Sequence, residues 1–594
     1  MDLELLGRNE LIKESQADVG LSGERARRGR LSKLLLVLTA LLVWLWWRIL
    51  TRVPIGLPRM TPRIVGFIPI ALLILMLGAA LLLPLVGAGR SPHVLFRPEE
   101  IDVSLDDVKG APVIVEEVVK SLNLFLGYKT FQERMGGNPR RAILFEGPPG
   151  TGKTYVAKAM AREAGVPFLF VSSSAFQSMF YGQTNRKIRS YFRALRATAR
   201  REGGAVGFIE EIDAIGASRS MVGTSTQREG IAGVVNELLI QLQSFDMPTG
   251  SARVKGWAIE HVNRLLPPGR RLPKPKTSPA NYLIVGATNR ASDLDIALTR
   301  PGRFDRSIYF DLPSRAGRRE IIDYYLDKKA HLPELDDLSR RDNLAAATFG
   351  YSPVMIEHLL DEALVWALRR GDTSLGWADL QRAKMTAEIG LAQPVEYTEA
   401  ERRTIATHES GHATVAWLVG RDRKLDVVSI IKRKDALGLL AHSDTEERWL
   451  VSRSEMHALI QIALGGMVAE ELFFGETTSG AASDLRVATT TAAQIVGSMG
   501  MDGTLFSWEA VSAIPANLVA KVASTDAGRD RVEAVLTNAQ AEVRTMLERN
   551  RNVVESLRDA LLERDELIGD EILDVIRSAT ASGVDFGVAG PTPS

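Results

Sequence analysis

The chain has 594 residues, of which 45% are hydrophobic and 24% charged, a composition that allows several folded domains with buried cores. Its net charge of +1 predicts no nucleic-acid partner. The absence of cysteine excludes disulfide bonds and cysteine-ligated metal sites. Any transition metal must therefore be held by the eight histidines and by carboxylates.

Two apolar stretches near the N-terminus predict a membrane anchor of two helices. Residues 34–50 are interrupted only by Arg48, and residues 64–86 contain no charge and are long enough to cross a bilayer. The alternative is a signal peptide followed by a buried helix, but the second stretch is too long and too uniformly apolar for a core helix. We expect an N-terminal tail at 1–33 and a short external loop at 51–63 between the two transmembrane helices.

Charges and aromatic residues around these stretches predict their orientation. Basic residues before the first stretch favour a cytoplasmic N-terminus, and tryptophans near its end are typical of a membrane interface (Arg25, Arg27, Arg28, Arg30 and Lys33; Trp44, Trp46 and Trp47). The turn between the stretches is also basic, so the charge signal is mixed. Acidic residues in the N-terminal tail argue against a mitochondrial transit peptide. We expect the plasma membrane of a bacterium, with the later domains facing the cytoplasm.

The rest of the sequence divides by its apolar pattern. After a predicted linker at 87–100, short apolar runs alternate with amphipathic helices over residues 101–316, as in an α/β domain. A smaller helical domain is expected at 317–390, a mostly helical domain at 391–580 and a disordered tail at 581–594. The predicted buried strands of the α/β domain are 142–145, 168–171, 206–209 and 282–286.

A phosphate-binding loop follows the first of these strands. Its residues are Gly147, Pro148, Pro149, Gly150, Thr151, Gly152, Lys153 and Thr154. The glycines let backbone N–H groups approach phosphate oxygens at the N-terminus of a helix. We expect Lys153 to contact the β- and γ-phosphates of ATP and the Thr154 hydroxyl to coordinate Mg²⁺. The preceding strand and the following helix are the context that this motif requires.

Polar residues at the ends of two later strands extend the predicted nucleotide site. Glu210 and Glu211 end the strand at 206–209, and carboxylates in this position bind Mg²⁺ and polarise the attacking water. Asn289 follows the strand at 282–286, and Arg303 and Arg306 come soon after it. Arginines there can stabilise the γ-phosphate held by a neighbouring subunit. The simpler alternatives are a solvated acidic turn and a basic surface loop.

A second motif, HExxH, predicts a zinc site. Residues i and i+4 share one face of a helix, so His408 and His412 can bind one Zn²⁺, with Glu409 beside it as general base. Two histidines on a helix surface are the alternative, but the apolar residues around the motif predict a buried helix. A catalytic zinc needs a third protein ligand, and spacing leaves five candidates: His442, Glu470, Glu471, Glu476 and Asp484.

The order of these motifs resembles that of FtsH-type membrane-anchored AAA+ zinc metalloproteases. The resemblance covers residues 103–576 and rests on the segments GPPGTGKT, EEIDAIG, ATNR, RPGRFDR, HESGH, LGGMVAEELFFG and TTSGAASDLRVAT. It implies an α/β P-loop AAA+ module with a helical lid, followed by a mostly α-helical zinc metalloprotease domain. It also implies a homo-hexameric ring that uses ATP, Mg²⁺ and Zn²⁺.

The resemblance also implies roles for nucleotide-site residues. Asn289 matches the family residue that senses the γ-phosphate, and Arg303 and Arg306 match arginine fingers that reach the next subunit. The segment containing Asp107 and Val108 is similar to the one that packs near adenine.

Two further roles concern the metal and the substrate. Among the candidate third ligands the resemblance favours Asp484, with Glu470 as second choice or as a residue that supports the ligands. Phe180 matches the family's pore loop, where six aromatic side chains in a ring would grip the substrate polypeptide whatever its sequence.

The sequence departs from the family pattern at several places. Glu210 stands where the family has aspartate, so we expect slow ATP hydrolysis, since Mg²⁺ demands near-ideal geometry. The loop at 51–63 leaves no room for a folded external domain, and the lid segment 350–353 differs mildly. An insertion at 247–280, rich in proline and basic residues, is expected to be a solvated loop, with a regulatory or partner-binding role as the alternative.

These features together predict a membrane-anchored, ATP-dependent zinc endopeptidase that unfolds, translocates and degrades membrane or cytosolic proteins. The alternative is a non-proteolytic AAA+ remodeller or scaffold with weak ATPase activity. Only the departure at Glu210 favours that alternative, whereas the intact His408, His412 and Asp484 oppose it.

Overall fold

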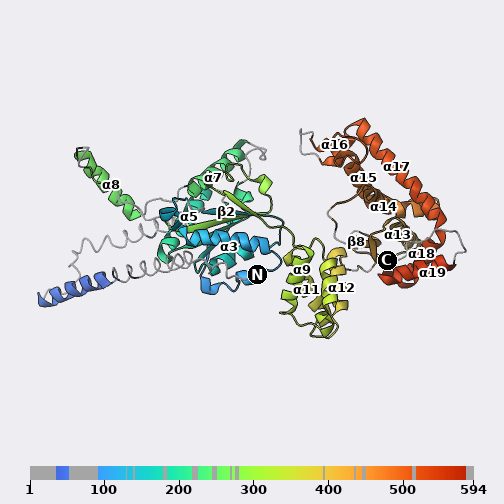
Figure 1. Cartoon of the computed structure of the whole chain (residues 1–594), viewed down its shortest axis with the longest axis horizontal. Helices are drawn as coiled ribbons and strands as arrows, with labels where there is room; N and C mark the ends of the chain where they lie inside the picture. Colours follow the sequence, from blue (N-terminus) through green and yellow to red (C-terminus); the bar gives the residue numbers. More distant parts are fainter. Residues whose placement is uncertain are drawn as a thin grey trace. The chain divides into compact units, whose positions relative to one another are not determined.

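The computed structural model describes most of the protein beyond residue 90 and part of the N-terminal region. The described residues are 28, 32, 35–51, 76 and 91–582, except 129, 138–140, 178–182, 217–224, 244–249, 268–270, 274–279, 392, 394, 434–435, 445–447, 449 and 511–516. They form two compact units, one of residues up to 328 together with 350–358, the other of residues 329–349 and those from 359 onward (Figure 1).

The first unit contains a six-stranded sheet in the order β1-β3-β4-β5-β2-β6. Its central strands read as nearly continuous apolar runs because both faces of the sheet are covered. All pairs are parallel except β1 with β3. The strands are β1 (Val94–Phe96), β2 (Ala142–Glu146), β3 (Phe168–Ser172), β4 (Ala205–Glu210), β5 (Tyr282–Thr288) and β6 (Arg306–Tyr309).

Helices cover both faces of this sheet, because alternate strand residues point to opposite sides. Phe145 packs with buried residues of α3 and α4 on one face, and Leu144 packs with those of α5 and α7 on the other. The helices of this region are α3 (Pro112–Leu126), α4 (Lys153–Glu163), α5 (Gln183–Glu202), α6 (Asp213–Gly216), α7 (Ser225–Gln243) and α8 (Gly250–Leu265).

The four predicted buried strands are confirmed, but two other predictions for this region are wrong in part. The expected linker 87–100 contains β1, because Phe96 packs against Phe168 with ring centroids 6.3 Å apart and the strand completes the edge of the sheet. The expected loop 247–280 contains α8, because residues 250–265 include no proline to interrupt a helix.

The segment after the sheet is helical, as predicted. It contains α9 (Arg315–Leu326), α10 (Leu338–Ala347), α11 (Pro353–Arg369) and α12 (Trp377–Ile389). The start of α11 packs on the phosphate-binding loop, where a Cβ added to Gly150 would lie 2.6 Å from the Ser352 hydroxyl and the Val354 amide donates to the Gly150 carbonyl at 3.3 Å.

The C-terminal domain is mostly helical, as predicted, but it also holds a small antiparallel sheet that the sequence reading missed. The sheet has the order β8-β7-β9, and β8 pairs with no further strand among the described residues. The elements are α13 (Glu399–Val419), β7 (Arg423–Ser429), β8 (Leu439–Asp444), α14 (Arg453–Phe474), α15 (Ala482–Gly497), α16 (Leu518–Ala523), α17 (Asp526–Arg549), α18 (Arg551–Arg564), β9 (Glu566–Ile568) and α19 (Asp570–Ser582).

Helices α13 and α14 approach each other through glycines. A Cβ added to Gly411 would lie 2.5 Å from the Gly465 carbonyl oxygen, and one added to Gly465 would lie 2.9 Å from the Gly411 carbonyl oxygen. At Gly466 an added Cβ would collide with the ring nitrogens of His408 and His412. Only residues without a side chain allow the two backbones to come this close.

The predicted two-helix anchor is not confirmed. Residues Leu35–Leu50 form an apolar helix, but residues 64–86 lie, apart from position 76, outside the described residues. Among the described residues, only α14 has the length and apolarity of a membrane span. More than half of its apolar window is buried in the C-terminal domain, as expected for a core helix.

The glycine contact predicts the effect of adding one methyl group. Gly411→Ala should lower the thermal unfolding midpoint of the C-terminal domain, since overpacking a close backbone contact costs about 1–3 kcal/mol. The measurement is thermal unfolding of the full-length protein with a chelator present, so that metal binding does not contribute. Gly256→Ala is the control, because a Cβ there would meet no atom within 4 Å. Equal midpoints for the two variants would contradict the prediction.

Candidate active sites

The phosphate-binding loop joins β2 to α4 and is shaped by glycines with positive φ. Gly147, Gly150 and Gly152 have φ of 142°, 77° and 89°, a region that side chains disfavour. A side chain at Gly147 would also collide with the Phe310 carbonyl. The loop therefore holds its backbone open at the N-terminus of α4, as phosphate binding requires.

Lys153 and Thr154 begin helix α4. The Lys153 ammonium is buried and donates to the carbonyls of Gly147 at 2.9 Å and Pro148 at 2.7 Å. Burial lowers the pKa of Lys153. The Thr154 hydroxyl donates to Glu210 Oε1 at 2.8 Å. The longer glutamate side chain thus reaches the hydroxyl that is expected to coordinate Mg²⁺.

Glu211 has a left-handed backbone conformation, with φ of 52°, which is uncommon for residues other than glycine. The buried Ser173 hydroxyl donates to the backbone carbonyls of both Glu210, at 2.5 Å, and Glu211. Strained residues of this kind cluster at functional sites when neighbouring groups hold them. Sequence reasoning missed Ser173, because nothing in its local pattern indicates that it reaches the end of another strand.

The segment predicted to lie near adenine lines a cavity of about 680 Å³ together with α9. Asp107 accepts a hydrogen bond at 2.8 Å from Tyr324, whose hydroxyl lies 3.4 Å from that of Tyr155 in α4. Burial acts to raise the pKa of Asp107, but hydrogen bonds from Ser104 and Tyr324 lower it overall. The two tyrosines were not predicted, although Tyr155 directly follows the phosphate-binding loop. Val108 also lines this cavity.

The hydrogen bonds described above include none of the remaining predicted nucleotide-site residues. Asn289 is exposed just after β5. Arg306 forms an ion pair with Glu117 of α3, and the Arg303 guanidinium donates to the Ala297 carbonyl. Phe180 lies outside the described residues.

His408, His412 and Asp484 bring their ligand atoms to one point. The Nε2 atoms of the two histidines are 3.0 Å apart, and Asp484 Oδ2 lies 3.1 Å from the first and 3.4 Å from the second. The two histidines are buried one turn apart on α13, and Asp484 comes from the first turn of α15. This His₂–carboxylate set matches the three-ligand pattern of catalytic zinc sites.

The opposite ring nitrogens are held by other groups. His408 Nδ1 lies 2.7 Å from Glu470 Oε1, and His412 Nδ1 lies 2.6 Å from the Ile462 carbonyl. Glu470 also accepts from the Thr478 amide at 2.5 Å. Such contacts leave both Nε2 atoms available to a metal, so Glu470 is placed to support a ligand rather than to be one.

The other three candidate third ligands are engaged or remote from the cluster. His442 Nδ1 lies 2.7 Å from the Arg423 guanidinium, Glu471 pairs with Arg544, and Glu476 is exposed. Among the described residues, the only group with metal-ligand geometry is therefore His408, His412 and Asp484.

The electrostatics of the cluster suit a cation. Burial opposes the charge on His408, but hydrogen bonds to Asp484 and Glu470 outweigh it and raise its pKa to about 10. Burial acts to raise the pKa of Asp484, but hydrogen bonds from the two histidines lower it overall. Without a metal, a proton on His408 supplies positive charge between the carboxylates, and a bound divalent cation would take that place.

Glu409 lies beside this cluster on α13. It is buried, and burial raises its pKa, partly offset by the neighbouring histidines. A Cβ added to Gly438 would lie 2.5 Å from Glu409 Oε1. The backbone just before β8 therefore packs directly against this carboxylate. Sequence reasoning missed Gly438, which precedes β8 by one residue.

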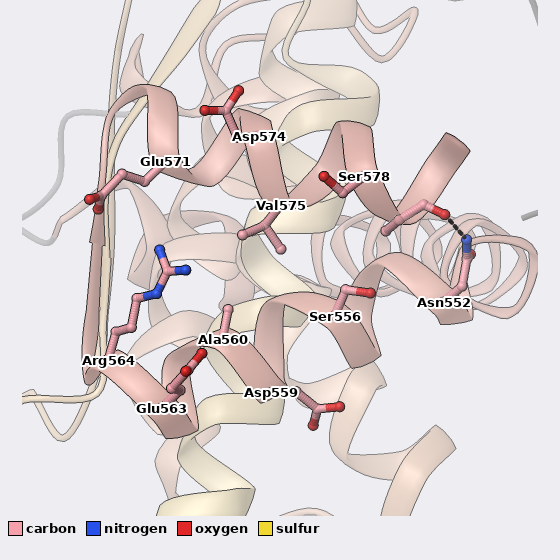
Figure 2. Close-up of a pocket in the computed structure, with 11 residues that line it drawn as sticks. Asn552, Ser556, Asp559, Ala560, Glu563, Arg564, Glu571, Asp574, Val575 and Ser578 are labelled. Carbon is pink, nitrogen blue, oxygen red and sulfur yellow. Dashed lines mark hydrogen bonds between the residues drawn. The ribbon is translucent and has the colours of Figure 1, made fainter. Parts of the chain in front are cut away.

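A separate cavity of about 710 Å³ lies between α18 and α19, with carboxylates on both helices (Figure 2). Its lining residues include Asn552, Asp559, Glu563, Glu571 and Asp574. None of the metal-site residues is among them, so this cavity is no part of the metal site.

Comparison with known proteins gives matches to both parts of the sequence. The family described as ATPase family associated with various cellular activities (AAA) matches residues 143–312, and Peptidase family M41 matches residues 395–575. The first match contains the phosphate-binding loop with Glu210 and Glu211, and the second contains His408, His412 and Asp484.

Similar proteins match most of the sequence. It is 33% identical over 510 residues to the ATP-dependent zinc metalloprotease FtsH 2 of Sorangium cellulosum, a match that covers 83% of this chain and 77% of that protein. It is 31% identical over 504 residues to FtsH of Thermotoga maritima, covering 82% and 75%. It is 31% identical over 487 residues to YME1L of Drosophila melanogaster, covering 81% of this chain and 60% of that protein.

The geometry predicts different effects for the two carboxylates near His408. Asp484→Asn should abolish most zinc binding, because two remaining ligands hold zinc weakly. Glu470→Gln should weaken zinc binding only about 10- to 100-fold. Zinc affinity is measured by competition with a chromophoric chelator, with the exposed Glu476→Gln as control. Retained zinc in Asp484→Asn together with lost zinc in Glu470→Gln would make Glu470 the ligand.

Proposed function

The chain belongs to the FtsH-type family of ATP-dependent zinc metalloproteases, and we propose that it uses ATP to unfold and translocate membrane or cytosolic proteins, which it then cuts at the zinc site. The observation that carries this proposal is the meeting of His408, His412 and Asp484 beside the buried Glu409. The non-proteolytic alternative is not favoured, because the complete ligand set and the base are both present.

Each residue of the metal site has a part in peptide hydrolysis. When bound by His408, His412 and Asp484, zinc supplies a Lewis acid and lowers the pKa of water. Glu409 takes a proton from the attacking water and passes it to the leaving amine. Glu470 keeps the His408 ring oriented through its Nδ1.

The small sheet offers a place for the substrate polypeptide. Strand β8 has an unpaired edge among the described residues, and Gly438 just before it lies against Glu409. A peptide that adds to this edge as a further strand gains backbone hydrogen bonds whatever its sequence. This fits an enzyme that degrades many different unfolded proteins.

On the nucleotide side, Glu210 and Thr154, which are hydrogen-bonded to each other, would hold Mg²⁺, and Glu211 would polarise the attacking water. We expect Asn289 to sense the γ-phosphate, and Arg303 and Arg306 to serve the neighbouring subunit of a homo-hexamer. Asp107 and Val108, on the cavity next to Tyr155, would flank the adenine base.

The substrate path and the membrane anchor rest on the sequence. Phe180 in the pore loop would grip the substrate polypeptide and pull it toward the zinc sites as ATP is hydrolysed. The apolar helix Leu35–Leu50 and residues 64–86 would cross a bacterial plasma membrane and leave both catalytic domains in the cytoplasm.

Two substitutions separate cleavage from translocation. The Glu409→Gln variant should still bind zinc, but it should cleave peptides and proteins about 10²- to 10⁴-fold more slowly, which is the contribution expected of a general base. The Phe180→Ala variant should cleave short peptides at the normal rate, because they need no translocation, but it should fail to degrade a folded protein. The assay follows a fluorogenic peptide and a folded fluorescent protein, with ATP, without ATP and with chelator. Degradation of the folded protein by Phe180→Ala at the native rate would contradict the translocation mechanism.

Substitutions of the two acidic residues at the end of β4, Glu210 and Glu211, should have different effects on ATP hydrolysis. Glu210→Asp should raise ATP turnover, since the shorter side chain is the form that the family uses at the Mg²⁺ position. Glu211→Gln should bind ATP and fail to hydrolyse it. Steady-state ATPase rate and retained nucleotide are the measurements. If the native protein and Glu210→Asp both lack ATPase activity, the ATP-driven function proposed above is wrong.

A further inference from the structure

Helix α8 and the segment just after it expose several apolar side chains. Trp257 is 63% exposed and Val262 is 45% exposed, and Leu272 beyond the helix is 48% exposed. Ala258 and Val262 are one turn apart on one side of the helix, whereas Gly256 and Glu260 are one turn apart on the other side. Trp257 lies at the border between the two sides, one turn before His261, and the two ring centroids are 4.2 Å apart. The helix is therefore amphipathic, and among its described side chains those of Trp257 and Val262 are exposed.

The insertion that contains α8 is strongly basic. Residues 247–280 hold seven basic residues and a single acidic one, Glu260, in a protein whose total net charge is only +1. Basic residues beside exposed tryptophan and aliphatic side chains are the composition of helices that lie in the interface of an anionic bilayer. The basic residues are Arg253, Lys255, Arg264, Arg270, Arg271, Lys274 and Lys276.

The connectivity of the sheet allows this insertion to reach the region of the membrane anchor. The register Phe96–Phe168–Val206–Leu283 places the start of β5, where the insertion ends, three strand spacings or about 14 Å from β1. Phe96 comes ten residues after the end of the second apolar stretch at residue 86. A chain of that length extends at most about 34 Å, so Phe96 lies within that distance of the end of the stretch. Residues 266–281 can extend about 50 Å, so α8 can reach the surface of the bilayer.

We propose that α8 and the basic segment after it bind the cytoplasmic surface of an anionic phospholipid bilayer. This proposal rests on the membrane anchoring proposed above. The side with Ala258 and Val262 enters the headgroup boundary, with Trp257 at its border, where tryptophan is favoured, and the basic residues contact anionic headgroups. This contact would hold the ATPase domain against the membrane, where membrane-protein substrates emerge.

The absence of cysteine allows a direct test, because one introduced cysteine carries the only label. The full-length protein, labelled with an environment-sensitive dye at Ala258→Cys, is reconstituted in nanodiscs of phosphatidylcholine alone or with an equal part of phosphatidylglycerol. Lipids with a spin label on the acyl group quench the dye only at the bilayer. Gly256→Cys labels the opposite side of α8 as a matched control, and Leu41→Cys reports on the anchor.

We expect quenching at Ala258 with phosphatidylglycerol, its loss in phosphatidylcholine alone or at high salt, and less quenching at Gly256 in every case. Replacing Arg270, Arg271, Lys274 and Lys276 with glutamate should abolish the Ala258 signal and leave that of Leu41 unchanged. Equal quenching at Ala258 and Gly256, or none at either, would overturn the proposal while a quenched Leu41 still supports the anchor.

Two further outcomes separate the alternatives. If the Ala258 dye is shielded from a water-soluble quencher but not quenched by lipid, a protein surface covers α8 and the proposal is wrong. An unquenched Leu41 dye would overturn the proposed anchoring itself, and quenching at Ala258 in that case would still support the contact of α8 with lipid.

Discussion

The metal site depends on the close approach of helices α13 and α14. Gly411 and Gly465 touch backbone to backbone, and Gly466 leaves room for both imidazoles. This distance lets α14 supply both partners of the Nδ1 atoms, the Glu470 carboxylate and the Ile462 carbonyl. With those nitrogens engaged, the two Nε2 atoms face the carboxylate of Asp484. A side chain at any of the three glycines would separate the ligands from the groups that orient them.

The nucleotide site also depends on glycines and on a side chain that comes from another segment of the domain. The phosphate-binding loop can stay open because its glycines take conformations that other residues avoid, while Glu211 takes one of them without being glycine. Ser173, from the end of a neighbouring strand, holds that backbone through two carbonyls. In both sites some of the residues that do chemistry are neighbours in sequence, as are Lys153 and Thr154 or His408 and Glu409, whereas Ser173 and Glu470 hold their partners from elsewhere in the domain.

The differences between expectation and structure also have physical causes. The sequence predicts a linker where β1 lies, because a strand of three residues is too short to show an alternating pattern. Its pairing with β3 in the tertiary structure identifies it as a strand. Helix α8 was read as loop because prolines and charges on both sides concealed a helical run with its own apolar side. The sheet of β7, β8 and β9 was missed because β9 joins strands far away in the sequence.

Local sequence alone determined the phosphate-binding loop, the four buried strands and the pairing of His408 with His412, because helical and strand periodicity place near neighbours without reference to the rest of the protein. The third zinc ligand could not be found in that way. Five side chains had suitable chemistry, and spacing gave no preference among them. Tertiary packing favours Asp484, because the contact of α13 with α14 sets Glu470 on one ring nitrogen of His408, and α15 brings Asp484 to the other.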